Sequence, residues 1–415
     1  MEVEILDGIM GAGKTTGMIR WMVANHQTQK FIYVSPLLSE VEKGGRIDLA
    51  TENTPLKFTF PTTEDNDTKS EHLLELLTQG LNIACTHSLY LNMTDKHFDE
   101  ISNKGYTVII DEEIGVIEGY QDFSESDLDF MLNMGCIGKQ ETDGMLLWIK
   151  DEPSIDERTN KYYRFKRHIQ NGLVYSTKRS KQMMVTQLPI KLITSAKRVV
   201  IMTYMFEGNI LSAFLKLKGI KYKPFTEVEL NHPSKEQLRS LINIVQPKDK
   251  KYEAIEKMTL SNTWWETKAT QQDVGLISKY ISLCARRCGA TAKDVLYTFP
   301  KNRKYGTISK KAHKVKPANL ISEKDGNVVW LASSTRATNK YAHKWCLIHC
   351  YNRYPNQQVN SYFQDYGQTV DSDVFATSEM LQWIWRSRIR NNQEIHIAIA
   401  SKRMKKLFLD WLYTA

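Results

Sequence analysis

The chain has 415 residues, which is long enough for two or three domains. Apolar residues make up 41% and charged residues 25%, a composition that excludes a disordered or fibrous chain. No run of eighteen apolar residues occurs, and no basic-then-apolar leader precedes the first predicted strand, so we expect a cytoplasmic protein without a membrane partner.

The net charge of +9 is unevenly distributed along the chain. Residues 1–150 hold 11 Lys and Arg against 25 Asp and Glu, a net of −14, whereas residues 151–415 hold 45 against 22, a net of +23. A basic segment of this size favours a polyanionic partner such as nucleic acid, with a solvated basic surface as the alternative.

The first predicted element is a short apolar strand at 3–6, after which residues 8–15 fit the phosphate-loop pattern G-x-x-x-x-G-K-[ST]. Apolar side chains then recur at helical spacing over 18–23. Glycines let the backbone approach phosphate oxygens, and the following helix directs its free N–H groups at them. We predict that Lys14 reaches the β- and γ-phosphates of ATP and that the Thr15 hydroxyl ligates Mg²⁺. The predicted nucleotide-binding residues are Gly11, Ala12, Gly13, Lys14, Thr15 and Thr16.

Further apolar strands are predicted in the first half of the chain, at 31–34, 81–85, 107–110 and 198–202. A helix is predicted near 73–77 and an irregular polar stretch at 51–70. Buried strands that alternate with helices predict an α/β fold, in which a parallel sheet carries helices on both faces.

A long excursion separates the strands at 107–110 and 198–202. Its first part, 118–129, is acidic, and its later part, 158–168, is basic and aromatic. We predict a basic hairpin or small subdomain, at about 115–195, inserted in the first lobe.

The second half of the chain repeats the alternation of strands and helices. A polar stretch at 226–262 is predicted to be a linker, which makes 1–225 the first lobe and 263–415 the second. The elements predicted in the second lobe are a helix at 276–287, strands at 295–299, 327–331, 345–348 and 395–399, and a basic helix at 402–412.

Two acidic residues, Asp111 and Glu112, follow the strand at 107–110. In phosphate-loop ATPases the first such carboxylate holds Mg²⁺, and the next orients and deprotonates the attacking water. We assign these roles to Asp111 and Glu112. Thr203, after the strand at 198–202, is either a sensor beside Asp111 or a capping residue.

Residues 382–390 hold three arginines, which we expect on one helix with a glutamine and two tryptophans. Arginine from a neighbouring lobe stabilises the transferring phosphoryl group in many ATPases. We therefore predict catalytic roles for Gln382, Arg386 and Arg390, with a basic helix face on DNA or solvent as the alternative.

The six cysteines are scattered, and two pairs lie four residues apart, which is helical rather than C-x-x-C spacing. We expect reduced, mostly buried thiols. A metal site that combines cysteines with His343 and His349 is the weaker alternative.

Taken in order, these segments resemble the motifs of a superfamily 2 DNA helicase or translocase with two RecA-like lobes. Residues 8–15 resemble motif I, 111–114 the DExx box and 382–390 motif VI. Supporting matches are 34–36 for motif Ia, 86–87 for Ib, 202–204 for III, 295–300 for IV and 334–339 for V. Phage and viral replication helicases are the nearest types, and the herpesvirus origin-binding protein is a more distant one.

The resemblance implies nucleic-acid contacts and also shows departures from the family pattern. Contacts to the phosphate backbone are implied for Ser35, Pro36, Thr86, His87, Thr335, Arg336 and Asn339. In motif VI, Trp385 and Arg388 stand where glycine is usual, and Ile389 takes the place of the second arginine, which leaves Arg388 and Arg390 as alternatives. Motif V has Ala337 where glycine is usual. Only seven residues precede the loop, too few for an adenine-recognising glutamine motif, so we expect loose base selectivity.

Two basic segments, 158–181 and 301–316, are further candidates for nucleic-acid contact, or else solvated loops. The tryptophan pairs at 264–265 and 383/385 are either base-stacking platforms or, more commonly, core residues.

These observations favour an ATP-driven motor on single-stranded or forked DNA, a helicase of phage or viral replication that works with other replication proteins in the host cytoplasm. A packaging terminase is one alternative, with Asp365, Asp371 and Asp373 as its nuclease cluster. An origin-binding or loader protein that uses ATP as a switch is the other.

Overall fold

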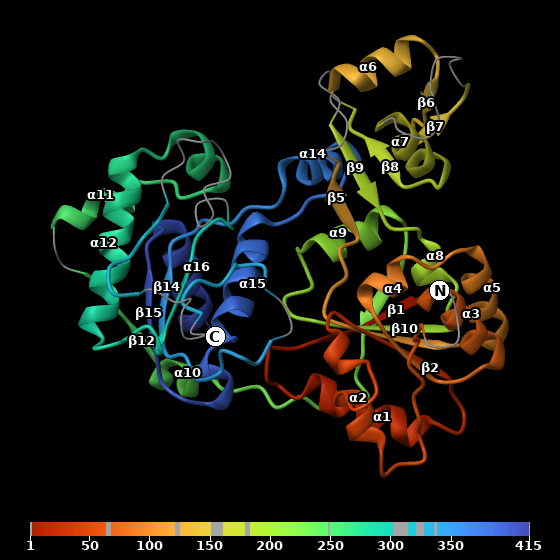
Figure 1. Cartoon of the computed structure of the whole chain (residues 1–415), viewed down its shortest axis with the longest axis horizontal. Helices are drawn as coiled ribbons and strands as arrows, with labels where there is room; N and C mark the ends of the chain where they lie inside the picture. The colour runs from red at the N-terminus through yellow and green to blue at the C-terminus, as the bar shows by residue number, and fades with distance from the viewer. Residues whose placement is uncertain are drawn as a thin grey trace. The chain divides into compact units, whose positions relative to one another are not determined.

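The computed structural model describes residues 2–63, 68–120, 125–150, 161–178, 183–247, 250–301, 314–320, 328–335 and 338–414 (Figure 1). The chain divides into two compact units. Unit 1 comprises Met1–Gly8, Lys14–Leu230 and Pro355–Asp371, and unit 2 comprises Ile9–Gly13, Asn231–Tyr354 and Ser372–Ala415. Each unit is built on a parallel sheet with helices, so the predicted α/β class with two RecA-like lobes is confirmed.

Unit 1 is organised around a six-stranded parallel sheet in the order β11-β1-β10-β4-β2-β3. The strands are β1 (Glu2–Asp7), β2 (Phe31–Ser35), β3 (Ile83–Thr86), β4 (Thr107–Asp111), β10 (Arg198–Thr203) and β11 (Lys221–Pro224). β10 pairs with both β1 and β4 and therefore lies between them. Because all the strands are parallel, the phosphate loop after β1, Asp111 and Thr203 emerge at the same edge of the sheet.

Helices cover both faces of this sheet (Figure 1). On one face, α1 (Lys14–Asn25) and α2 (Arg46–Thr51) pack against the side chains of alternate strand residues such as Tyr33 and Ile109. The other face carries α4 (His87–Leu91), α8 (Lys191–Thr194) and α9 (Ile210–Leu217). Two more helices, α3 (Lys69–Gln79) and α5 (Asp95–Lys104), pack against each other.

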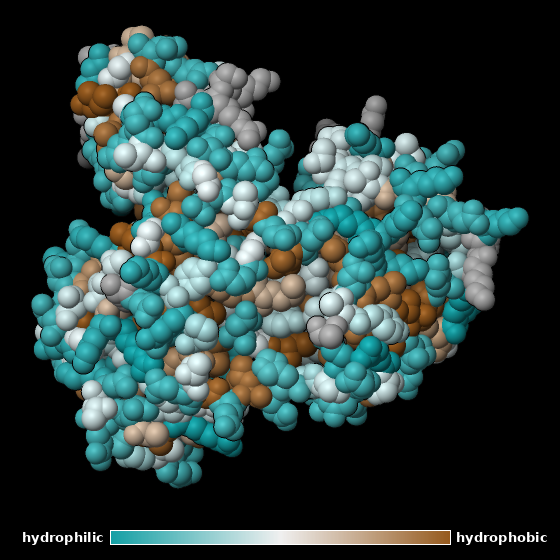
Figure 2. Space-filling model, turned by 180° about the vertical axis from the view of Figure 1, so that it is seen from behind, coloured by the Kyte–Doolittle hydropathy of each residue, from teal (hydrophilic) through white to brown (hydrophobic). Residues whose placement is uncertain are grey.

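The predicted insertion forms a small subdomain between β4 and β10. Its elements are β5 (Ile117–Gly119), α6 (Glu125–Asn133), β6 (Ile137–Lys139), β7 (Leu146–Trp148), α7 (Lys161–Gln170), β8 (Val174–Ser176) and β9 (Met184–Gln187). β5, β9 and β8 form one antiparallel sheet, and β6 and β7 form a hairpin. Figure 2 shows apolar side chains on the surface of this subdomain. Its exposed apolar residues include Phe130 and Ile149, at 56% and 63% exposure.

A strap from the second half of the chain, Pro355–Asp371, belongs to unit 1. Its helix α14 (Gln357–Asp365) packs on β5 and β9 of the insertion. The Tyr362 hydroxyl donates to the Asp143 carbonyl at 2.6 Å, and the Tyr366 hydroxyl donates to the Ser176 carbonyl at 3.1 Å. The sequence division into 1–225 and 263–415 had placed this segment in the second lobe.

Unit 2 contains a four-stranded parallel sheet in the order β12-β15-β14-β13. The strands are β12 (Ile242–Ile244), β13 (Val295–Thr298), β14 (Cys346–His349) and β15 (Ile395–Ile399). One face packs on α11 (Glu253–Glu256) and α12 (Gln271–Arg287) through alternate apolar strand residues, and α15 (Ser372–Ile384) and α16 (Lys402–Tyr413) lie on the other (Figure 1).

Two predicted segments of the second half differ from the structure. The stretch 226–262 is not a plain linker, since it holds α10 (Lys235–Leu241), β12, the 3₁₀ turn η2 (Lys250–Tyr252) and α11. β12 is a three-residue edge strand among polar residues, too short to show a period in the sequence. Residues 328–331 do not form a strand; they make an isolated bridge between Tyr297 and Trp330.

None of the helices within the described ranges has both the length and the apolar character needed to cross a membrane.

Candidate active site

The phosphate loop joins β1 to α1. Gly11 and Gly13 have φ of +84° and +89°, a left-handed backbone that side chains with a Cβ rarely adopt, so the two glycines are required by the path of the loop. α1 begins at Lys14, directly after the loop, and the Lys14 ammonium donates to the carbonyl of Gly8. Helix N-termini bind phosphate through unpaired N–H groups, so the local geometry is that of a phosphate site.

Asp111, at the end of β4, is the centre of a hydrogen-bond cluster in unit 1. The Thr15 hydroxyl, from the first turn of α1, donates to Asp111 Oδ2 at 3.1 Å. The Tyr33 hydroxyl, from β2, donates to the same oxygen at 2.6 Å. His87 Nε2 lies 2.9 Å from the Asp111 carbonyl oxygen, which accepts its proton. The structure thus brings together Thr15 and Asp111, as predicted, and adds Tyr33, for which the sequence carries no motif.

The environment of Asp111 is strongly desolvated. Burial raises the pKa of Asp111 to about 6, and the nearby carboxylates of Glu112 and Glu40 add to this rise, whereas the hydrogen bond from Tyr33 opposes it. Burial and the Asp111 carboxylate raise the pKa of Tyr33 well above 10, so the phenol keeps its proton and acts as the donor.

Glu112 and Glu113 continue the acidic segment. Glu112 has φ of +63°, a left-handed conformation that is unusual outside glycine and is often found at functional sites. Glu113 Oε1 accepts a hydrogen bond from the Thr203 hydroxyl at 2.5 Å. The side-chain hydrogen bond of Thr203 therefore goes to Glu113, a partner that the sequence does not indicate.

The residues of unit 1 that were predicted to contact nucleic acid include one that is fully buried and two that have hydrogen-bond partners within the unit. Ser35 is fully buried and donates to Glu40 Oε2 at 2.5 Å, so a contact between Ser35 and a phosphate backbone does not fit this arrangement. The Thr86 hydroxyl caps α4 by accepting from the Leu89 N–H at 3.2 Å, and His87 contacts the Asp111 backbone. Pro36 is half-buried in the turn after β2.

A groove of about 1040 Å³ runs between the insertion and the α4–α5 turn of unit 1. Its basic residues are largely neutralised, because Lys191 pairs with Asp95 at 2.6 Å and Lys218 with Asp143 at 3.3 Å. Arg167 also lines this groove. Such mixed charge does not favour a polyanion in the groove.

Two of the predicted motif V residues, Thr335 and Asn339, are among the described residues of unit 2. Thr335 is half-buried and its N–H donates to the Ala332 carbonyl at 3.0 Å, whereas Asn339 is exposed. Arg336 and Ala337 fall outside the described residues, as does most of the basic segment 301–316 and both ends of 158–181.

The arginines of 386–390 do not continue the helix that holds Gln382, which corrects the predicted arginine-rich helix. α15 ends at Ile384, and its last turn tightens as the Arg386 N–H bonds to the Trp383 carbonyl at 3.1 Å. Arg386 follows in the turn with 4% exposure, and Arg388 begins the 3₁₀ helix η4 (Arg388–Asn391).

The remaining side chains of this segment have local partners in unit 2. Gln382 Nε2 donates to Ser378 Oγ at 3.1 Å, and Arg390 donates to the Thr338 carbonyl at 3.3 Å. Arg388 stacks over the Trp345 ring at 5.4 Å and bonds to the Glu394 carbonyl. Both arginines thus have local partners, and Arg388 and Arg390 stay alternatives for the second arginine.

Three tryptophans of unit 2 and most of the cysteines of the chain are core residues. Trp265, Trp383 and Trp385 are 0%, 0% and 3% exposed, so the core interpretation is confirmed for them and base stacking is excluded in this structure. All six cysteines are free, and five are buried. Within the described residues no group of three potential metal ligands occurs.

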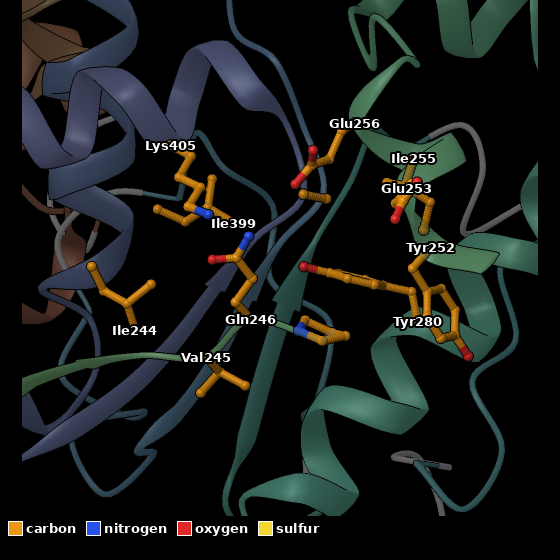
Figure 3. A pocket seen from close by; sticks show the side chains of 12 residues that line it. Ile244, Val245, Gln246, Tyr252, Glu253, Ile255, Glu256, Tyr280, Ile399 and Lys405 are labelled. Carbon is orange, nitrogen blue, oxygen red and sulfur yellow. The ribbon is translucent and has the colours of Figure 1, made fainter. Parts of the chain in front are cut away.

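Unit 2 also contains a small cavity of about 310 Å³ beyond the carboxyl ends of β12 and β15 (Figure 3). The side chains of Gln246, Glu256 and Lys405 point into it (Figure 3). Gln246 and Glu256 are exposed and therefore hydrated, and none of the predicted site residues lines this cavity.

Comparison with known proteins gives one family model and one relative. The model of the YonV C-terminal Rossmann-like domain matches residues 236–412, which comprise most of unit 2 together with the strap. The SPbeta prophage-derived uncharacterized protein YonV of Bacillus subtilis (strain 168) is 28% identical over 431 residues, an alignment that covers 99% of this chain and 98% of the relative.

Three solved structures are similar over 99% of this chain. Xpd4 of S. tokodaii is 12% identical, with 94% of its chain covered and a TM-score of 0.49. A DEAD box protein from Methanococcus jannaschii is 12% identical, with 85% covered and a TM-score of 0.29. A hypothetical ATP-dependent RNA helicase from Sulfolobus tokodaii is 11% identical, with 90% covered and a TM-score of 0.28.

Proposed function

We propose that this protein is a nucleic-acid-dependent ATPase, and more specifically a DNA helicase or translocase of phage replication. The observation that carries the proposal is the hydrogen bond of 3.1 Å between Thr15, in the phosphate loop, and Asp111, at the end of β4. It joins the two sequence motifs that an ATPase of this type needs at one edge of the sheet.

The residues at this edge fit Mg²⁺. The ion prefers oxygen ligands and keeps several waters, and the Thr15 hydroxyl and the Asp111 carboxylate are oxygen donors in direct contact. When bound, Mg²⁺ would neutralise charge on the β- and γ-phosphate oxygens of ATP. Lys14 would add a positive charge there, and the loop N–H groups would hold the phosphates.

Water activation is assigned to Glu112. It adjoins Asp111, and its left-handed backbone directs its side chain differently from a residue that continues the strand. A carboxylate in that place can accept the proton of the attacking water. Arg386 and Arg390 remain the proposed stabilisers of the transferring phosphoryl group.

The nucleic-acid partner is supported by charge and by the relative. The net charge of +23 in residues 151–415 suits a polyanion, and the similar YonV protein is prophage-derived, which fits a role in phage DNA metabolism. Single-stranded or forked DNA is the proposed substrate.

The terminase alternative receives no support from its proposed nuclease cluster. Asp365 accepts from the Lys178 N–H at 2.8 Å, and Asp373 pairs with Arg403 at 2.6 Å. These two carboxylates already have structural partners, so they are not poised as metal ligands.

The proposal is tested by strand displacement on 3′-tailed, 5′-tailed, forked and blunt DNA, with matching RNA substrates, alongside DNA binding. Lys14→Ala and Glu112→Gln should abolish displacement and spare DNA binding, whereas Lys96→Ala and Glu52→Gln, at exposed positions, should behave as the unmodified protein. Tight sequence-specific duplex binding with negligible ATP turnover would instead favour the switch, and metal-dependent DNA cutting would favour the terminase.

A further inference from the structure

Tyr33 lies in an apolar layer, yet its hydroxyl ends at the proposed metal-holding carboxylate. In the β2–β4 pairing Tyr33 is opposite Ile109, and both side chains are part of the apolar cluster on the α1 side of the sheet. Asp111 is two residues beyond Ile109 and so faces the same side. Two residues of strand span about 6.6 Å, which a tyrosine side chain bridges when it leans along the strand.

The two donors to Asp111 converge on one oxygen. Thr15 Oγ1 and the Tyr33 hydroxyl lie 3.1 Å and 2.6 Å from Oδ2. Within the described part of the chain, no hydrogen bond reaches the other oxygen, Oδ1. The carboxylate is therefore held by one oxygen, and the other remains open for a ligand.

The Tyr33 hydroxyl is not needed to fill space. Its ring packs in the same cluster as Phe31 and Met18, where a phenylalanine ring would occupy the same volume. A buried hydroxyl and a buried carboxylate are both costly unless paired, so their partnership is a specific feature rather than a by-product of packing.

We propose that Tyr33 is a positioning residue for Asp111, one that fixes the orientation of the carboxylate for Mg²⁺. This inference rests on the proposed ATPase function. If the Thr15 oxygen is engaged by the metal, Tyr33 is the donor from the sheet that keeps Oδ2 in place. Partners of this kind hold metal ligands in the productive orientation, and their loss typically weakens metal affinity by about 10–100-fold.

The test measures Mn²⁺ binding in the presence of ADP, by electron paramagnetic resonance and calorimetry, so that the readout does not depend on turnover. Tyr33→Phe should weaken Mn²⁺ binding by about 10–100-fold and leave metal-free ADP binding unchanged. Tyr106→Phe is the matched control, because Tyr106 is also buried in unit 1 but donates to the Leu81 carbonyl at 2.7 Å. Its Mn²⁺ affinity should equal that of the unmodified protein.

A double-mutant comparison separates positioning from a general structural role. In Asp111→Asn the carboxylate is lost, so adding Tyr33→Phe should weaken Mn²⁺ binding no further. Equal Mn²⁺ affinity in Tyr33→Phe and the unmodified protein, or additive losses in the double variant, would overturn the role of Tyr33 alone. If the unmodified protein binds no Mn²⁺ with ADP, the proposed ATPase function fails first, and the role of Tyr33 falls with it.

Discussion

Thr15 Oγ1 lies 3.1 Å from Asp111 Oδ2, although 96 positions separate the two residues in the sequence. The contact exists because β1 and β4 are parallel and are separated only by β10. It links the first turn of α1 to the end of β4, so changes at either residue should affect the same property, the binding of Mg²⁺ with a nucleotide.

The Thr15 hydroxyl is predicted to be essential where its methyl group is not. Thr15→Ser keeps the hydroxyl and should retain ATP hydrolysis, whereas Thr15→Val keeps the shape and should lose it. The decrease in activity should exceed the decrease of roughly 10–100-fold that is typical when a residue that only hydrogen-bonds to a metal ligand is replaced. Steady-state ATPase rates over a Mg²⁺ titration measure this, and equal rates for the serine and valine variants would contradict it.

The contact between Thr203 and Glu113 should stabilise unit 1. The hydroxyl donates to a carboxylate at 2.5 Å, and hydrogen bonds to charged groups contribute about 1.5–3 kcal/mol. Thr203→Val should lower the free energy of unfolding by that order. Thr107→Val is the control, since Thr107 donates to a neutral amide, Gln29, at 2.8 Å and should cost less. Urea denaturation measures both, and a larger loss in Thr107→Val would contradict the account.

The strap should be part of the folded core of unit 1. Tyr362 is fully buried, so Tyr362→Ala should lower the free energy of unfolding by about 3–5 kcal/mol. Hydrogen exchange should rise in β5 and β9, on which α14 packs. Tyr163→Ala, at a residue that is 39% exposed, is the control and should change neither quantity. Unchanged exchange in β5 and β9 would show that the strap is dispensable there.

His349 predicts how the stability of unit 2 depends on pH. The ring is fully buried, neither ring nitrogen has a partner among the described residues, and burial lowers the pKa of His349 to about 3, with the Arg353 charge adding to the effect. The unfolded chain binds a proton at this imidazole near pH 6.5, whereas the folded chain does so only near pH 3. The neutral imidazole therefore does not lower the free energy of unfolding above pH 6.5, and the free energy of unfolding decreases as the pH falls below that value.

The size of that effect is about 1.4 kcal/mol per pH unit between these two values. His349→Leu removes the titration, so its stability should fall less than that of the unmodified protein between pH 7 and pH 5, by about 2 kcal/mol. Urea denaturation at both pH values measures the difference. Parallel losses in the two proteins would contradict the assignment.

Much of the fold could be predicted because strong local patterns carry it. The β-branched run of β4, the glycines of the phosphate loop and the apolar strand β15 at 395–399 lie where the sequence places them. Asp111 was assigned correctly to a strand end, since acidic residues directly after a buried strand are a local signal.

The contacts that differ from prediction depend on tertiary geometry. Ser35 resembles a solvent-facing motif residue, but its hydroxyl donates a hydrogen bond to the Glu40 carboxylate, five residues later in the chain. Tyr33 contacts Asp111 only through the register between β2 and β4, which no single segment reveals.

Chain routing and helix ends were equally hard to predict. The strap leaves the second half of the chain and packs on the insertion, an arrangement that has no signature in composition. α15 ends at Ile384 although Trp385 continues the apolar pattern of the sequence. Trp385 lies in the turn after the helix, where it is buried and packs edge-on against Trp411.

The most direct test of the central claim is the rate of ATP hydrolysis with and without single-stranded DNA. We predict that DNA stimulates hydrolysis by the unmodified protein several-fold, and that Glu112→Gln lowers the stimulated rate by about 10²–10⁴-fold while DNA binding is retained. Hydrolysis that is indifferent to every nucleic acid, or that survives in Glu112→Gln, would contradict the account.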